Sequence, residues 1–219
     1  MPIVLVTGSS RGIGLELCRQ FRARGADVIA VCRRSSAALE ELGVRIIDGI
    51  DVAEPAAAKE LRRRLDGVHV DILVNNAGIL RRDGLEDIDF EGILEQFRVN
   101  TLGPLRITHA LLDNLGRGSK VAIITSRMGS VADNTSGGYY GYRVSKAGVN
   151  MIGMSLKHDL EPRGVAVALL HPGMVATDMT GGQGIDVQQS AAGLIQRIDD
   201  LDMSNSGNFW HAEGYVLPW

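Results

Sequence analysis

Short hydrophobic runs alternate along the chain with longer segments in which apolar positions recur every three or four residues. The short runs are rich in Val, Ile and Leu, and several are apolar at nearly every position, which is typical of strands buried on both faces of a sheet. These runs predict strands over residues 3–7, 28–31, 44–47, 72–75, 121–125 and 165–170. The longer segments predict helices over residues 13–24, 56–65, 90–115, 143–161 and 187–201.

The regular alternation of strands and helices predicts an α/β protein with a doubly wound sheet, because parallel strands are joined by right-handed helical crossovers. Pro162 and Gly164 predict the end of a helix before the sixth strand. Residues 206–219 predict a last short strand and a turn at the sheet edge. The length suits one domain better than two. We therefore expect a single domain over residues 1–219, with a mostly parallel seven-stranded sheet and helices on both faces.

Composition and charge narrow the class of protein. Hydrophobic residues make up 45% of the chain and charged residues 22%, as in ordinary globular proteins. The 23 basic and 26 acidic side chains give a formal net charge of −3, so no nucleic acid or membrane partner is expected. The first predicted strand begins at Ile3, without room for a signal peptide, and no apolar run approaches the roughly 20 residues of a membrane span. A cytoplasmic protein is expected.

Cysteine and histidine positions do not indicate a metal site. Cys18 and Cys32 are the only cysteines, and the five histidines are scattered without metal-ligand spacing. We expect buried thiols and no bound metal.

The segment TGSSRGIG, from Thr7 to Gly14, joins the first strand to the first helix. Glycines at such a turn let the backbone approach a pyrophosphate closely, and the amide groups of the following helix face its charge. The alternative is that the glycines serve only a tight turn, although the position after an N-terminal strand favours the phosphate site. The candidate cofactor-binding residues here are Gly8, Ser10, Arg11, Gly12, Ile13 and Gly14.

Arg33 and Arg34 follow the second strand, where an NAD-binding domain usually has a carboxylate for the adenine ribose. A guanidinium group binds phosphate oxygens in bidentate fashion, so these residues, with Arg11, favour NADP(H) over NAD(H). The alternative is that both arginines are ordinary loop residues. Asp51 has two equally supported interpretations: it caps a helix that begins near Glu54, or it reaches the adenine amino group.

Tyr142 and Lys146 are four residues apart and share one face of the longest predicted helix. An ammonium group close to a phenol lowers the phenol pKa, and such a pair can protonate a developing alkoxide. Ser126 follows an apolar strand at the edge where open α/β sheets bind ligands, and its hydroxyl can hold a carbonyl oxygen. Alone, the Tyr–Lys spacing is more often an ordinary surface pair.

Further motifs accompany these residues: Asn75-Asn76-Ala77-Gly78 after the fourth strand, Asn100, and Pro172-Gly173. Together with the glycine segment, Ser126, Tyr142 and Lys146, they resemble the short-chain dehydrogenase/reductase family, whose members have a Rossmann domain. Residues 133–143 and the ending Leu217-Pro218-Trp219 resemble, more narrowly, the C-factor-like and sniffer-like carbonyl reductases.

The resemblance implies a role for each catalytic residue. Tyr142 is the general acid-base, and Lys146 lowers its pKa and holds the nicotinamide ribose. Ser126 orients the carbonyl, and Asn100 anchors a water that relays protons to Lys146. Further cofactor contacts are implied for Asp51, Val52, Asn76, Ala77, Gly78, Tyr142, Lys146, Pro172, Gly173, Val175 and Thr177.

The resulting hypothesis is an NADP(H)-dependent oxidoreductase that reduces a ketone or aldehyde to an alcohol. Two alternatives are a catalytically silent NADP(H)-binding regulatory protein and an alcohol or steroid dehydrogenase that works oxidatively. The partner is a small carbonyl or alcohol molecule whose identity the sequence leaves open. Tyr139 and Tyr140 are expected as pocket walls, and the short segment at 178–187 predicts an open site. The resemblance allows a homodimer, a homotetramer or a monomer.

Overall fold

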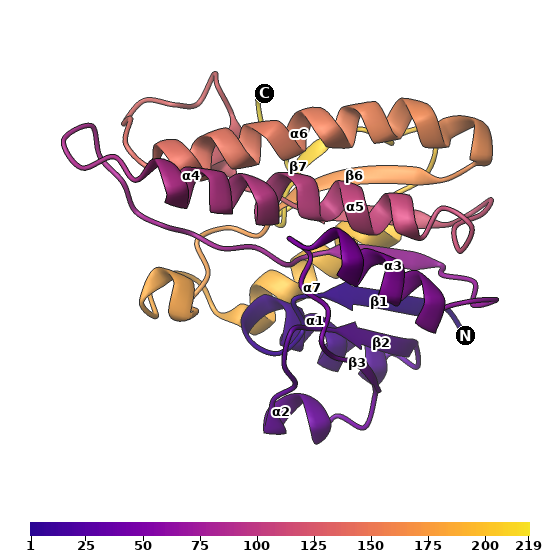
Figure 1. Cartoon of the computed structure of the whole chain (residues 1–219). Helices are drawn as coiled ribbons and strands as arrows, with labels where there is room; N and C mark the ends of the chain where they lie inside the picture. The colour runs from indigo at the N-terminus through magenta and orange to yellow at the C-terminus, as the bar shows by residue number, and fades with distance from the viewer.

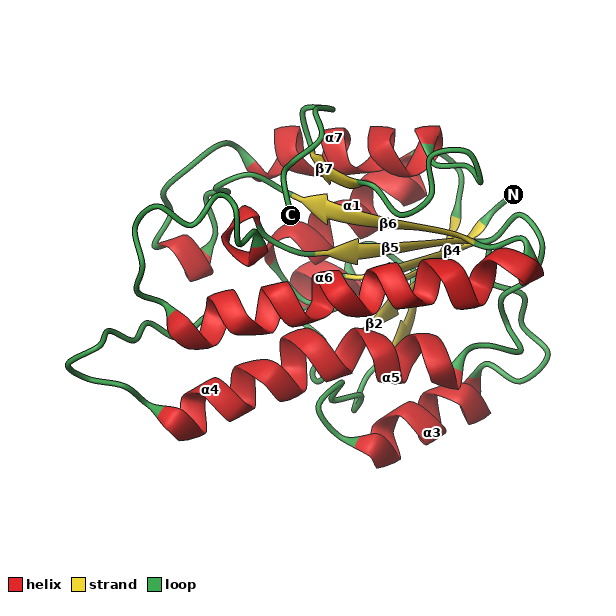
Figure 2. Cartoon of the chain, turned by 90° about the horizontal axis from the view of Figure 1, so that it is seen from above, coloured by secondary structure: helices red, strands yellow, loops and turns green.

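The strands lie side by side in the order β3-β2-β1-β4-β5-β6-β7, and every neighbouring pair is parallel. The computed structural model describes residues 1–219 and places helices on both faces of this sheet (Figures 1 and 2). The strands are β1 (Ile3–Thr7), β2 (Asp27–Val31), β3 (Arg45–Ile47), β4 (Ile72–Asn75), β5 (Lys120–Ile124), β6 (Ala166–His171) and β7 (Phe209–His211). The predicted doubly wound α/β fold is therefore confirmed.

The helices alternate with the strands along the chain. They are α1 (Gly12–Ala23), α2 (Ala37–Glu40), α3 (Pro55–Arg64), α4 (Phe90–Gln96), α5 (Gly103–Ala110), α6 (Tyr140–Leu160) and α7 (Val187–Asp200), with a π-helical stretch, η1 (Phe97–Leu102), and three 3₁₀ turns, η2 (Arg127–Gly129), η3 (Glu161–Arg163) and η4 (Asp178–Thr180). No helix combines the length and the apolar character that crossing a membrane requires.

Successive residues of the central strands pack into different hydrophobic clusters. Val4 and Val6 of β1 belong to a cluster that includes Leu194 of α7, whereas Leu5 belongs to a second cluster that includes Ile107 of α5. Side chains alternate between the two faces of a strand, so each face of β1 has its own core. Figure 2 shows the two layers, with α1 and α7 on one side of the sheet and α3, α5 and α6 on the other.

The single helix predicted over residues 90–115 is wrong in detail. The structure has α4, then the π-helical stretch η1, then α5, which ends at Ala110. Pro104 lies at the start of α5 and has no amide hydrogen, so it cannot donate to the Asn100 carbonyl as a residue of an unbroken α-helix would. The spacing of hydrophobic residues does not reveal the π-helical stretch, because the same face of the chain stays buried through α4, η1 and α5.

Two smaller differences concern a short helix and the start of α6. The short helix α2 was not predicted, and Ser36 caps it by accepting a hydrogen bond from the Leu39 amide. Helix α6 begins at Tyr140, three residues before the predicted 143, so Tyr142 lies inside its first turn. The tail does form a last strand, and an antiparallel bridge joins Trp210 to Val216 beyond it.

Candidate active site

The glycine segment lies at the carboxyl ends of β1 and β4, where the strand order reverses direction. Gly8 has a φ of +66°, and a Cβ at this position would lie 2.7 Å from Ala77 Cα. A Cβ on Gly14 would lie 2.3 Å from the Gly8 carbonyl oxygen. Both positions therefore require glycine. Helix α1 begins directly after this turn without a side-chain cap, so the amides of its first turn remain for an anionic group.

Hydrogen bonds join the ends of β1 and β4 beside this turn. The Thr7 hydroxyl accepts from the amides of Asn76 and Ala77, at 3.0 and 3.1 Å. The Asn76 side chain donates to the carbonyl oxygens of Thr7 and Gly8, at 2.9 and 3.2 Å. The Asn76 side chain thus holds the glycine turn against β4.

The three arginines expected near an adenine ribose phosphate are all exposed. Arg33 lies 3.8 Å from Asp51, and Arg11 lies 3.3 Å from Asp178. Arg34 has no ion pair. Pairing of exposed charges in water is weak, so Arg33 and Arg11 are readily drawn to a phosphate.

Asp51 has a local structural role in addition to its pairing with Arg33. Its Oδ1 accepts a hydrogen bond from the Ala53 amide at 2.9 Å, and its carbonyl accepts from the Glu54 amide. The N-cap of α3 is Glu54, so Asp51 shapes the turn that precedes the helix and does not cap the helix itself. The side chain of Val52 is buried and packs where Gly103 leaves room for it.

Tyr142, Lys146 and Ser126 meet at the carboxyl ends of β4 and β5. All three are buried, with at most 8% of each residue exposed. The Lys146 ammonium donates to the Ile124 carbonyl at 2.9 Å and lies 5.7 Å from the centre of the Tyr142 ring. The Ser126 hydroxyl accepts from the Met128 amide at 3.1 Å, and it lies close enough to Tyr142 to affect the Tyr142 pKa. The predicted catalytic side chains therefore share one site.

The electrostatics of the pair differ from the expectation. Burial raises the pKa of Tyr142 to about 12, although its hydrogen bond with Ser126 acts in the opposite direction. Burial also lowers the pKa of Lys146 to about 8. The prediction that Lys146 lowers the Tyr142 pKa is thus not met in the protein alone, because burial disfavours both charged forms.

Asn100 lies in η1 with 1% of its surface exposed. Its Oδ1 accepts from the Ile79 amide, and its Nδ2 donates to the Ile79 carbonyl and to the Ser145 hydroxyl. A Cβ on Gly78 would lie 3.3 Å from Asn100 Oδ1 and 3.7 Å from Lys146 Nζ. Asn100 is therefore close to Lys146, but both hydrogens of its side-chain amide are already used.

Ser145 is a residue of this site that sequence reasoning missed. Its hydroxyl donates to the Tyr142 carbonyl at 2.8 Å and accepts from Asn100, and its own carbonyl accepts from Thr101. Its position three residues after Tyr142, on the same face of the helix, was the available signal.

The segment after β6 lies over the glycine turn. Thr177 Cγ2 lies 3.5 Å from the place of a Cβ on Gly12, and Pro172 accepts a hydrogen bond from Ser190. Val175 is bridged to Ile185, which closes residues 176–184 into a short loop. Met179 is exposed on this loop, and Met174 is exposed just before it. The pocket walls predicted at Tyr139 and Tyr140 are both partly exposed at the start of α6.

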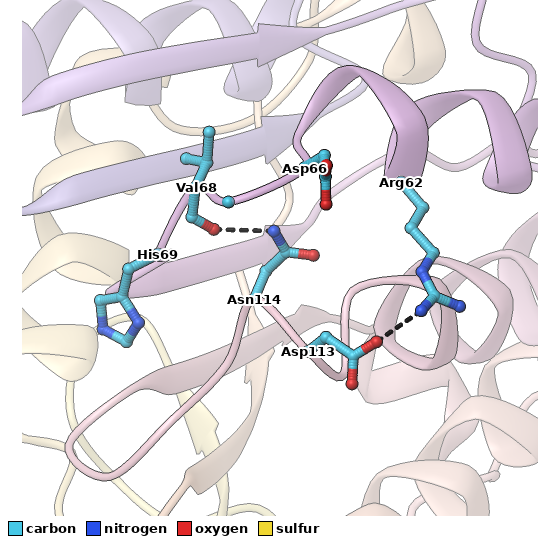
Figure 3. Close-up of a pocket in the computed structure, with 7 residues that line it drawn as sticks. Arg62, Asp66, Val68, His69, Asp113 and Asn114 are labelled. Atoms are coloured by element: carbon cyan, nitrogen blue, oxygen red, sulfur yellow. Dashed lines mark hydrogen bonds and ion pairs between the residues drawn. The ribbon is translucent and has the colours of Figure 1, made fainter.

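A polar cavity of about 220 Å³ lies elsewhere, between the end of α3 and the turn after α5. Figure 3 shows Arg62 paired with Asp113, and the Asn114 side chain donating to the Val68 carbonyl. His69 lies just before β4, so the cavity is at the amino ends of the strands. It is remote from Tyr142.

A family model described as short chain dehydrogenase matches residues 2–188. The chain belongs to the short-chain dehydrogenase family. This confirms the family resemblance drawn from the glycine segment, Ser126, Tyr142 and Lys146.

Two relatives of this short-chain dehydrogenase come from bacteria. A 1-hydroxy-2-glutathionyl-2-methyl-3-butene dehydrogenase of Rhodococcus sp. (strain AD45) is 45% identical, with both chains covered completely. The C-signal of Myxococcus xanthus is 45% identical over 154 residues, which are 68% of this chain and 93% of the relative. The second relative agrees with the C-factor-like features of residues 133–143.

Solved structures of carbonyl reductases are similar over the whole short-chain dehydrogenase chain. The carbonyl reductase Sniffer of D. melanogaster is 29% identical with a TM-score of 0.92, covering 100% of this chain and 99% of its own. A carbonyl reductase from Pseudomonas aeruginosa PAO1 in complex with NADP is 34% identical with a TM-score of 0.89, and both chains are covered completely.

Proposed function

We propose that this short-chain dehydrogenase is an NADP(H)-dependent oxidoreductase that reduces a ketone or aldehyde to an alcohol. The observation that carries the proposal is the meeting of Tyr142, Lys146 and Ser126 beside the glycine turn, at one edge of the sheet. Such a reduction needs a proton donor, a nearby cation and a hydroxyl that can hold the carbonyl oxygen. Tyr142, Lys146 and Ser126 supply these three groups.

The residues present suit a nicotinamide dinucleotide. Gly8 and Gly14 let the turn pack tightly against Ala77 and Asn76, where any Cβ would clash, and the first amides of α1 have no side-chain cap. The Lys146 ammonium has three hydrogens and one hydrogen-bond acceptor, the Ile124 carbonyl, so it can donate to ribose hydroxyls as well. When bound, the cofactor supplies the hydride.

The protein's own residues then manage the proton. Ser126 holds the carbonyl oxygen next to the Tyr142 hydroxyl, which donates its proton to that oxygen as negative charge develops. The raised pKa of Tyr142 keeps the phenol protonated at neutral pH, which is the form needed in the reductive direction. Both side-chain amide hydrogens of Asn100 are already used, so a water relay toward Lys146 would use an oxygen of Asn100, such as its carbonyl, to which Pro104 cannot donate.

The preference for NADP(H) is supported by charge at the adenine end. Arg33 and Arg34 are exposed at the end of β2, with Arg11 in the glycine segment. Asp51 is the one carboxylate within 4.0 Å of the Arg33 guanidinium, at 3.8 Å. The similar carbonyl reductase from Pseudomonas aeruginosa was solved with NADP.

The test is the loss of NADPH absorbance with a panel of ketones, aldehydes and quinones. We expect turnover with at least one of them, a higher kcat/KM with NADPH than with NADH, and a loss of at least about a hundredfold in kcat for Tyr142→Phe. NADPH affinity of Tyr142→Phe should stay near that of the wild type. An equal or higher kcat/KM with NADH would contradict the cofactor preference.

Each of two other functions is supported by one of the relatives. The Rhodococcus dehydrogenase favours oxidation of an alcohol, including one that carries a glutathionyl group. The Myxococcus C-signal favours a regulatory role. Faster reduction of NADP⁺ or NAD⁺ by alcohols than oxidation of NADPH by carbonyls would support the first. Tight NADPH binding with no turnover in either direction would support the second.

We also propose a homodimer that pairs through α4 and α6. Phe90 and Leu94 on α4 and Val144 and Met151 on α6 are large apolar residues that are 47–71% exposed. The two helices are neighbours in Figures 1 and 2. A neighbouring subunit would remove this surface from water.

A further inference from the structure

The chain that follows the Asn76–Ala77–Gly78 motif is bonded to the α4–η1 segment at alternate residues. Ile79 exchanges two hydrogen bonds with the Asn100 side chain, both at 2.8 Å. Two residues later, the Arg81 amide donates to Gln96 Oε1 at 2.9 Å. Gln96 is 1% exposed. Residues 79–83, which we call the strut, are therefore held in a fixed position by these hydrogen bonds.

The strut ends at Asp83, which contacts the start of α6. The Asp83 carbonyl accepts from the Tyr139 amide at 2.9 Å. Its carboxylate oxygen Oδ2 accepts from the Gly141 amide at 3.1 Å. Asp83 is 9% exposed, and its other oxygen, Oδ1, is buried without a hydrogen-bond partner. In Figures 1 and 2 the loop before α4 and the loop before α6 lie at the same end of the molecule.

Helix α6 has no cap of its own at this end. Its N-cap residue, Tyr139, has a φ of 51°, the one positive φ outside glycine, and makes no side-chain cap hydrogen bond. The first amides of a helix need acceptors, and an anion there is also favoured by the helix dipole. Asp83 supplies both from a different part of the chain.

The first turn of α6 is also pressed against α4. A Cβ on Gly141 would lie 2.4 Å from Gln96 Nε2 and 2.9 Å from Ile93 Cγ1. Tyr142 is the next residue. The first turn of α6 is thus held on one side by the Gly141 packing and at its end by the Asp83 carboxylate.

We propose that Asp83 is a positioning residue for the reaction: its carboxylate caps α6 from the β4–α4 loop and so sets the Tyr142 hydroxyl relative to Ser126 and the Asn76–Ala77–Gly78 segment. Asp83 acts through Tyr142 and touches no reacting atom. This inference rests on the proposed role of Tyr142. A small displacement of a proton donor lowers the rate of the chemical step while the cofactor site, built on other elements, is unchanged.

The test compares Asp83→Ala and Asp83→Asn in the full chain, with the carbonyl compound that gives the highest rate in the panel. We expect Asp83→Ala to lower kcat by at least about tenfold, with the NADPH Kd within about threefold of the wild type. Asp83→Asn keeps an acceptor oxygen and should recover most of that loss. Asp87→Ala is the matched control, because Asp87 is an exposed aspartate of the same loop whose Oδ1 accepts only from Gly84.

Three results would overturn the inference. One is an Asp83→Ala variant with wild-type kcat. The second is a parallel fall of kcat, NADPH affinity and Tm, which indicates a merely structural role. The third is an Asp83→Asn variant as slow as Asp83→Ala. If Tyr142→Phe keeps its activity, the proposed function itself fails, and that outcome is separate because it does not depend on Asp83.

Discussion

At the scale of single residues, burial controls the chemistry of the Tyr142–Lys146 pair. Their spacing in the sequence suggests mutual stabilisation of the charged forms, but the structure surrounds both groups with protein. Desolvation then favours the neutral phenol and the neutral amine, raising one pKa and lowering the other. The amount of water around a side chain is a property of the folded chain, so the sequence predicts the pair and not its titration.

The lowered pKa of Lys146 predicts a pH dependence of stability. The pKa falls from 10.5 in the unfolded chain to about 8 in the folded protein, so the unfolded state binds more protons between these values. The destabilisation by the buried charge is therefore full below pH 8 and is relieved as the pH rises toward 10. We expect the free energy of unfolding of the wild type, relative to Lys146→Met, to increase from pH 7.5 to pH 10.

Urea denaturation of both proteins without cofactor measures this difference. Taking the difference removes the other groups that titrate at alkaline pH, including Cys18, whose pKa burial raises to about 12. A difference that is constant or falls over this pH range would show that Lys146 is charged and stabilised in the folded protein.

At the scale of elements, most strands and helices follow from the hydrophobic pattern, and the exceptions have local causes. The six strands were placed within a residue or two because each is a short hydrophobic run, and several are apolar on both faces. The π-helical stretch between α4 and α5 was missed, since Pro104 and the π turn change the hydrogen bonding without changing the buried face. The beginning of α6 was missed, since Asp83, remote in sequence, supplies its cap.

The glycine turn gives a prediction at this scale. Gly8→Ala should raise the NADPH Kd by at least about tenfold, because the new Cβ would lie 2.7 Å from Ala77 Cα and push the turn away from β4. Gly25→Ala is the matched control. Gly25 has a similar positive φ of +83°, but a Cβ there has nothing within 4 Å.

Both substitutions should lower the Tm, because both impose a left-handed conformation on alanine, at a cost of about 1 kcal/mol. Gly8→Ala should lower it further, because its Cβ also meets Ala77. Only Gly8→Ala should weaken cofactor binding, measured by the fluorescence of bound NADPH. Equal NADPH affinities for the two variants would mean that the close approach to Ala77 is not needed for the site.

At the scale of the whole molecule, the exposed apolar surface of α4 and α6 predicts self-association. We expect a dimer at micromolar concentration by size-exclusion chromatography with light scattering. Met151→Glu should shift it toward monomer, because a charge buried in an apolar interface without a partner is costly. Val131→Glu is the control, since Val131 is 79% exposed on a loop outside these helices. A wild-type monomer, or equal behaviour of the two variants, would contradict the proposed interface.

Local sequence was sufficient for the fold class, the glycine turn and the residue types of the site, because hydrophobic period, turn chemistry and the Tyr142–Lys146 spacing are encoded within short segments. Pairings between distant segments came only from the tertiary structure: Asp83 against Gly141, Arg33 against Asp51, and His171 against His211 with ring centres 5.0 Å apart. Burial and charge at a site are sums over all its neighbours, and those neighbours are assembled only when the sheet and its two helical layers come together.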